Sequence, residues 1–169
     1  MAQMSNLEVM ERYATLGPDF LTYLCVRSSQ GTLDPPASEP GLTLALMGPM
    51  VFASDTGEAT KVTLAGDEAS AAPEVEAALR QGKRLIRGKV EMKAQDAVWN
   101  FTLDGETFDM KSMKLPVPKV ADADEYMALR VQAIQHLAML INDLFEAFLP
   151  IRLDAELWRA EVEGWMGRG

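Results

Sequence analysis

One apolar pattern in the last third of the chain most constrains the fold. Seven apolar residues between positions 127 and 148 recur at alternating intervals of four and three, the spacing of one face of an α-helix. They are Met127, Val131, Ile134, Ala138, Ile141, Phe145 and Phe148. Leu137, Leu140 and Leu144 widen this seam. A helix with so wide an apolar face needs another layer of structure to cover it.

Polar and cyclic residues set the expected limits of this helix. Asp122 stands where an N-cap residue belongs, and Glu125 stands at the capping-box position three residues later. Pro150 lacks the backbone N–H that a helix interior requires, so we expect the helix to end there. A shorter amphipathic helix is expected from Asp154 to about Met166.

The middle of the chain has the period of two that is typical of half-buried strands. Apolar and charged residues alternate from Ile86 to Lys93, and a second alternation runs from Ala97 to Leu103 after the turn Ala94-Gln95-Asp96. Further segments are predicted as strands over 42–54, 61–64 and 108–115 and as helices over 19–27 and 71–81. The predicted fold class is therefore α+β, with an antiparallel sheet of about five or six strands packed against the long C-terminal helix.

Length and composition favour one intracellular domain. A chain of 169 residues suits a single domain over 1–169, with residues 1–15 flexible and a loop over 28–41 that holds three prolines. The single cysteine, Cys25, forms no internal disulfide, which favours a reducing compartment. No apolar run approaches the ~20 residues that cross a bilayer. We therefore expect a cytoplasmic protein without a membrane partner.

The residues offer little chemistry for catalysis. One histidine, His136, and one cysteine cannot supply the usual zinc ligands, and no glycine-rich phosphate loop is present. The pairs Glu91/Lys93 and Asp109/Lys111 have the acid-x-Lys form of metal-dependent nucleases, but no further acid is placed upstream to complete a magnesium site. The prediction is a protein that is not an enzyme, with no catalytic residue, metal site or cofactor.

The charge distribution is uneven. The net charge is −9, yet residues 80–119 hold nine basic and five acidic side chains. Seven of the basic residues are candidate DNA contacts, and they are Arg80, Lys83, Arg84, Arg87, Lys89, Lys93 and Lys111. Those on strands share a face with Asn100 and Thr102, and such a face contacts phosphates without reading bases. The alternative is a solubilising face neutralised by ion pairs.

Several segments resemble short RdgC-like recombination-associated proteins. The resemblance spans about residues 16–166, in the family's order. The segments that carry it are Gly17–Ser28, Lys61–Gly66, Ala77–Arg84, Trp99–Asp104, Met113–Pro116 and Phe148–Leu153. Cys25 replaces a usual aromatic residue, and the chain lacks roughly the first half of the long members. The resemblance implies a non-catalytic DNA-binding protein of recombination or replication, and carries over only Arg80 and Lys83 as DNA contacts. Its long members are implied to encircle duplex DNA as ring-like homodimers, whereas a ring is not assumed for this chain.

Together these observations predict sequence-independent DNA binding, to duplex rather than single-stranded DNA, by a cytoplasmic or nucleoid-associated protein. The wide apolar seam also predicts a homodimer, formed through the long helix, the sheet edge or both. The alternative function is a protein–protein interaction module that acts through the helix over 122–149 and binds no DNA.

Overall fold

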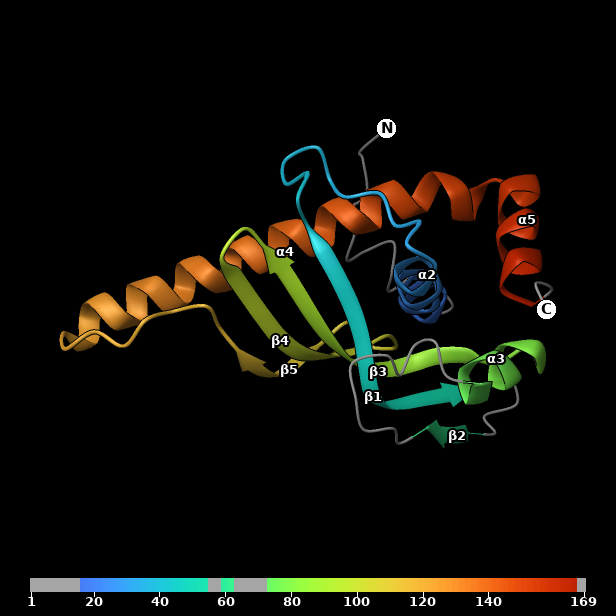
Figure 1. Ribbon diagram of the computed structural model, residues 1–169, viewed down its shortest axis with the longest axis horizontal. Coiled ribbons are helices and arrows are strands. Elements are labelled where there is room, and N and C mark those ends of the chain that lie inside the picture. The colour runs from blue at the N-terminus through green and yellow to red at the C-terminus, as the bar shows by residue number, and fades with distance from the viewer. Residues whose placement is uncertain (1–15, 55–58, 63–72, 167–169) are drawn as a thin grey trace.

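The computed structural model describes residues 16–54, 59–62 and 73–166. The expectation for residues 1–15 therefore falls outside the described residues. Figure 1 shows a twisted sheet with helices above it and at one end. The helices are α2 (Leu16–Gln30), α3 (Pro73–Arg80), α4 (Ala123–Leu153) and α5 (Ala155–Met166). The strands are β1 (Thr43–Ala53), β2 (Ala59–Val62), β3 (Arg84–Ala94), β4 (Ala97–Asp104) and β5 (Met110–Lys114).

The five strands form one sheet in the order β2-β1-β3-β4-β5, and each neighbouring pair is antiparallel. The α+β fold with a long C-terminal helix is confirmed. Residues 28–30 belong to α2 rather than to the expected loop, and residues 31–41 contain neither helix nor strand. No helix in the described ranges has the length and apolar character needed to cross a membrane.

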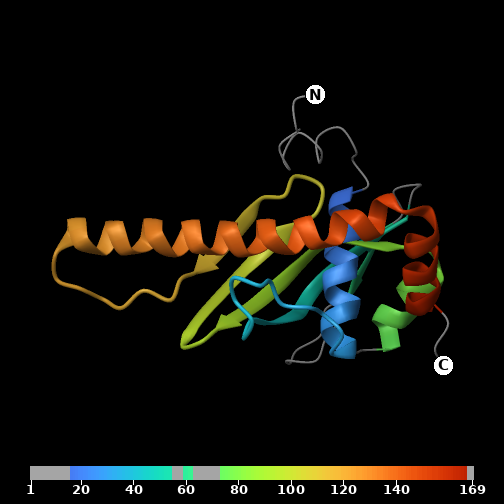
Figure 2. The same ribbon diagram turned by 90° about the horizontal axis from the view of Figure 1, so that it is seen from above.

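The core lies between one face of the sheet and the helices α2 and α4 (Figures 1 and 2). On the sheet side, Trp99 is buried and its Nε1 donates a hydrogen bond to the carbonyl oxygen of Ala133 on α4, at 3.1 Å. Between the helices, the ring of Phe20 lies 5.1 Å from that of Phe145 and 5.3 Å from that of Phe148. Aromatic pairs at these separations add to the stabilisation by burial.

The seam of α4 is covered over only half of its length. Asp122 caps the helix, since its Oδ1 accepts hydrogen bonds from the backbone N–H of Asp124 and Glu125. The side chains from Leu137 to Phe148 that face the sheet and α2 are buried, whereas Met127 and Val131 are exposed. The helix therefore extends beyond the layer that it covers, as Figure 2 shows.

The prediction that Pro150 ends the helix is wrong, because α4 continues through it to Leu153. Tertiary contacts hold the last turn. The Arg152 Nε donates to Asp19 Oδ2 at 2.9 Å, and Ile151 packs against the core. These contacts offset the hydrogen bond that proline cannot form.

Irregular pairing modifies two strands. Val51 of β1 pairs with Arg87 of β3, and Phe52 of β1 pairs with Leu85 of β3. Ile86, between these two β3 residues, therefore has no partner on β1. As a result Leu85 is buried, and Ile86 is only half-buried rather than a full member of the buried face. Thr102 of β4 pairs with Lys111 of β5 and Asn100 pairs with Lys114, so between these pairs β4 has one residue and β5 has two. Ser112 takes a positive φ of 53° at this β-bulge.

Candidate nucleic-acid interface

The face of the sheet opposite α2 and α4 is polar and carries most of the strand cations. Along β3, Arg87, Lys89, Glu91 and Lys93 alternate with buried residues. They pair across to Asp104, Thr102, Asn100 and Val98 of β4, respectively. Directly paired residues share a face of the sheet. The predicted alternation is therefore confirmed, with Asn100 and Thr102 on the face of the β3 cations.

The bulge in β5 adds two lysines to this face. Lys111 pairs with Thr102 and Lys114 pairs with Asn100, which places both lysines on the polar face although they are three residues apart. In a regular strand, positions 111 and 114 would point to opposite faces. Lys114 was not among the predicted contacts, because the bulge that brings it onto this face depends on the pairing of β4 with β5.

Ion pairs divide the cations of the face into two groups. The Arg87 guanidinium lies 3.4 Å from the Asp104 carboxylate, and the Lys93 ammonium lies 3.2 Å from the Glu91 carboxylate. Lys89, Lys111 and Lys114 form no ion pair with any of the described residues. We call these three residues the lysine surface. Its ammonium groups are the cations of this face that have no carboxylate oxygen of a described residue within ion-pair distance.

The lysine surface spans three neighbouring strands. Lys89 on β3 and Lys111 on β5 both flank Thr102 on β4. Strands lie about 4.8 Å apart, so the two backbones are separated by about 10 Å. Flexible lysine side chains at this separation can reach several phosphates of one nucleic-acid strand, which carries a charge about every 3.4 Å along its axis.

The β1 residues on this face of the sheet are small or apolar. On β1 the exposed face presents Thr43, Ala45 and Met47, which pair with Lys93, Glu91 and Lys89. The exposed faces of the described strands β1, β3, β4 and β5 carry no aromatic side chain. Base stacking, on which single-stranded nucleic-acid binding depends, therefore has no platform on these strands.

The remaining three of the seven predicted contacts lie elsewhere. Arg80 is exposed at the end of α3. Lys83 is only 7% exposed. Arg84 is half-buried, with its Nε donating to Asp19 Oδ1 at 3.2 Å. The structure thus brings together Arg87, Lys89, Lys93 and Lys111 on one face and separates them from the other three.

Arg84 belongs to a buried cluster around Asp19. The Asp19 carboxylate accepts hydrogen bonds from both Arg84 and Arg152. The two guanidinium groups lie over the rings of Trp165 and Trp158, each at 5.1 Å from the ring centroid. Burial raises the pKa of Asp19, and the two arginines oppose that shift. This cluster joins α2, β3, α4 and α5, which is a structural role for Arg84.

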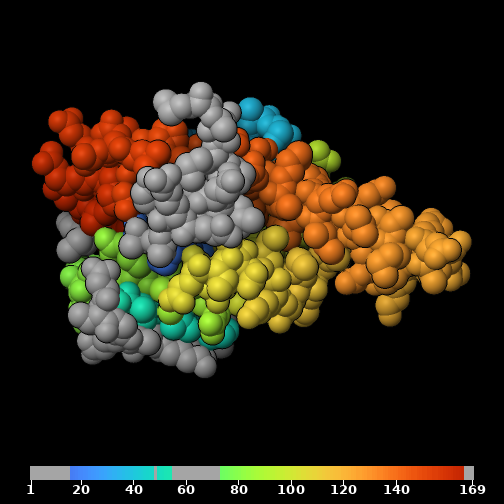
Figure 3. All heavy atoms as spheres, turned by 180° about the vertical axis from the view of Figure 1, so that it is seen from behind, coloured from blue at the N-terminus to red at the C-terminus, as the bar shows by residue number. Residues whose placement is uncertain are grey.

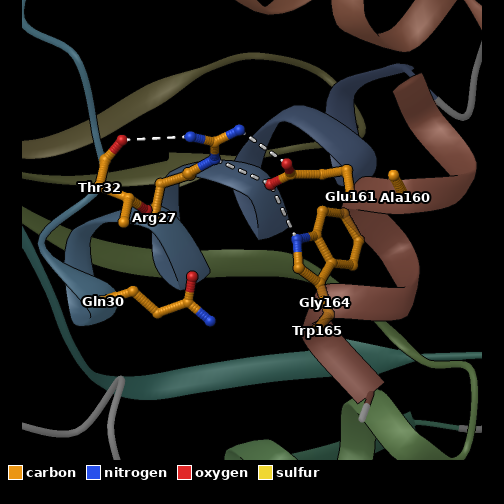
Figure 4. Close-up of a pocket in the computed structure, with 7 residues that line it drawn as sticks. All are labelled: Arg27, Gln30, Thr32, Ala160, Glu161, Gly164 and Trp165. Atoms are coloured by element: carbon orange, nitrogen blue, oxygen red, sulfur yellow. Dashed lines mark hydrogen bonds and ion pairs between the residues drawn. The ribbon is translucent and has the colours of Figure 1, made fainter. Parts of the chain in front are cut away.

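A pocket of about 210 Å³ lies between α2 and α5 (Figure 4). Its cation, Arg27, donates from Nε and Nη2 to the two carboxylate oxygens of Glu161, at 3.0 and 2.8 Å, and from Nη1 to the carbonyl oxygen of Thr32. Glu161 also accepts a hydrogen bond from Trp165. Because Arg27 and Glu161 satisfy each other, this pocket presents no unpaired charge to a ligand.

The described residues contain no metal-binding cluster, and the cysteine among them is buried. They contain no group of three or more histidine, cysteine, aspartate or glutamate residues able to hold a metal ion. Cys25 is buried, and burial raises the pKa of its thiol to about 12. The ring of His136 packs edge-on against Trp99 at 5.1 Å. No family model, curated protein or solved structure matches this chain.

Proposed function

We propose that the protein is a non-catalytic DNA-binding protein that contacts phosphates through the lysine surface. The observation that carries this proposal is the gathering of Lys89, Lys111 and Lys114 on one open sheet face, where none of them pairs with a described acid. Arg87 and Lys93 flank them. Binding of this kind releases counterions, so it is independent of sequence and sensitive to salt.

Duplex DNA is the form that this surface suits best. Duplex binding needs cations spaced to follow the backbone, whereas single strands are held largely by stacking on aromatic side chains. The described strands offer cations on this face and no aromatic ring. The resemblance to RdgC-like proteins adds recombination or replication as the process and the cytoplasm or nucleoid as the location.

The test compares two variants of equal charge change. Lys111→Gln with Lys114→Gln removes two members of the lysine surface, and Lys119→Gln with Arg159→Gln removes two exposed cations elsewhere. Fluorescence anisotropy with labelled duplex and single-stranded DNA is measured at about 50 and 200 mM salt. The first variant should lose affinity and reduce the slope of log K against log salt by about 1.8, while the second should match the wild type. Equal effects of both variants, or no binding by the wild type, would refute the proposal.

A second candidate function rests on the uncovered part of α4. Met127, Val131 and Met139 are exposed apolar residues on this helix. An exposed apolar face of this kind marks a protein-binding surface. On this reading the helix over 122–149 is an interaction module, and the simplest partner is a second copy in a homodimer. A protein that forms a dimer in light scattering but binds neither DNA form would favour this second function.

A further inference from the structure

The N-terminal part of α4 forms an arm that projects from the molecule. No residue from Ala123 to His136 is buried, and Leu137 is the first that is. The Trp99 Nε1 of β4 donates a hydrogen bond to the carbonyl oxygen of Ala133, and no residue of 122–132 belongs to the core. Residues 122–132 therefore stand clear of the core, and Figures 2 and 3 show this part of α4 extending away from the body. We call residues 122–132 the arm.

The arm is acidic and apolar at once. Asp122, Asp124 and Glu125 are exposed at its tip. Met127 is 59% exposed and Val131 is 45% exposed on the turns that follow. The cation of the arm, Arg130, lies over the ring of Tyr126 at 5.7 Å. The arm thus presents negative charge beside uncovered apolar surface.

The lysine surface has the complementary chemistry. It carries three lysines without described acidic partners, and half-exposed Ala45 and Met47 and exposed Val98 lie on the same sheet face. The dimensions also agree, because about ten helical residues span roughly 15 Å and three adjacent strands span about 10 Å between their outer backbones. An acidic, apolar arm therefore matches this face in charge, in apolar content and in length.

The arm cannot reach the lysine surface of its own molecule. The helix α4 packs on the buried face of the sheet, through Trp99, whereas Lys89, Lys111 and Lys114 lie on the opposite face. The occupant must therefore come from another molecule. A second copy of the chain supplies both an arm and a lysine surface, so that two copies can satisfy each other by a twofold exchange.

We propose that the arm of each copy docks on the lysine surface of a second copy, forming a reciprocal dimer that competes with DNA. The competition rests on the proposed function, because the same three lysines are assigned to phosphates there. In this dimer the acids at the arm tip neutralise the lysines, and Met127 and Val131 cover the apolar positions of β1 and β4. Phosphates of bound DNA displace the arms from these lysines.

Charge reversal on each side tests the contact. Asp124→Lys with Glu125→Lys reverses the arm, and Lys111→Glu with Lys114→Glu reverses the lysine surface. Sedimentation and light scattering at low salt should give the wild type a mass near twice the 18.6 kDa of one chain. Each reversal alone should give a mass near 18.6 kDa, and the two together should restore the dimer. Glu156→Lys with Glu163→Lys, on α5, is the control and should leave the dimer intact.

Two further measurements keep the contact apart from folding and from DNA binding. Asp124→Asn with Glu125→Gln keeps the shape of the arm, and it should still weaken the dimer at least tenfold. The arm reversal should bind duplex DNA at least as tightly as the wild type, whereas the lysine reversal should lose both DNA and dimer. A wild-type monomer, or a dimer that neither reversal disturbs, would overturn the inference. A wild-type protein that binds no DNA, but whose dimer is still restored when the two charge reversals are combined, would refute only the proposed function.

Discussion

Glu91 is the residue at which the proposed DNA contact is most sharply testable, because its removal should strengthen binding. Its carboxylate lies 3.2 Å from the Lys93 ammonium on the same face of β3. Both side chains are partly exposed, at 28% for Glu91 and 56% for Lys93, so a neutral residue should leave the fold intact. Surface pairs of this kind are worth about 0–1 kcal/mol. Glu91→Gln should therefore release one cation at little structural cost.

The size of the gain follows from counterion release. Three free lysines predict a slope of log K against log salt of about −2.7, and a fourth cation moves it to about −3.6. One added phosphate contact multiplies the affinity by roughly fifteen at about 50 mM salt and by roughly four at about 200 mM. The assay is fluorescence anisotropy with a labelled duplex over a salt series, and unfolding by urea checks that stability is unchanged.

The matched control is Glu163→Gln, which removes an exposed acid from α5 and changes the net charge equally. This control variant should have the same slope of log K against log salt as the wild type. An affinity for Glu91→Gln that equals that of this control would show that DNA does not approach the sheet face next to Lys93. That result would refute the reasoning, even if the protein binds DNA by another surface.

Three further predictions concern folding and reactivity. Cys25 should resist thiol reagents at pH 8 until the protein unfolds, because burial raises its thiol pKa to about 12 and the thiolate is the reactive form; rapid labelling of the native protein would contradict this. Gly105→Ala should destabilise the fold by about 1–3 kcal/mol in urea unfolding, since a Cβ there would lie 3.3 Å from the backbone at Gly17. The control is Gly164→Ala, because a Cβ at Gly164 meets no atom within 4 Å. Asp19→Ala should cost roughly 3 kcal/mol, because it leaves two half-buried arginines without their shared acid. A loss of unfolding free energy below about 1 kcal/mol would show that water replaces the hydrogen bonds that both arginines make to Asp19.

Local patterns in the sequence were sufficient to predict most elements of the fold. The capping by Asp122 and the alternation along β3 and β4 each depend on a few neighbouring residues. The apolar seam predicted a long helix for the same reason, since helical periodicity is a property of one segment. These features need no knowledge of what packs against them.

The candidate site was predictable only in part. Alternation placed Lys89 on the polar face, and the structure confirms that position. Lys83 is buried in the folded chain, and the pairing of Arg84 with Asp19 depends on α2, which is distant in sequence. Grouping basic residues by their nearness along the sequence therefore included Lys83 and Arg84, which do not lie with the cations of the polar face.

The type of most elements and the faces of the regular strands follow from local periods of two and of about 3.6 residues, so they can be predicted without a structure. Three other features depend on how distant segments pack together. The bulge at Ser112 turned Lys114 onto the polar face, contacts at Asp19 kept α4 helical past Pro150, and the extent of the sheet left Met127 and Val131 uncovered. Each depends on strand register or on packing between distant segments, which no local pattern encodes.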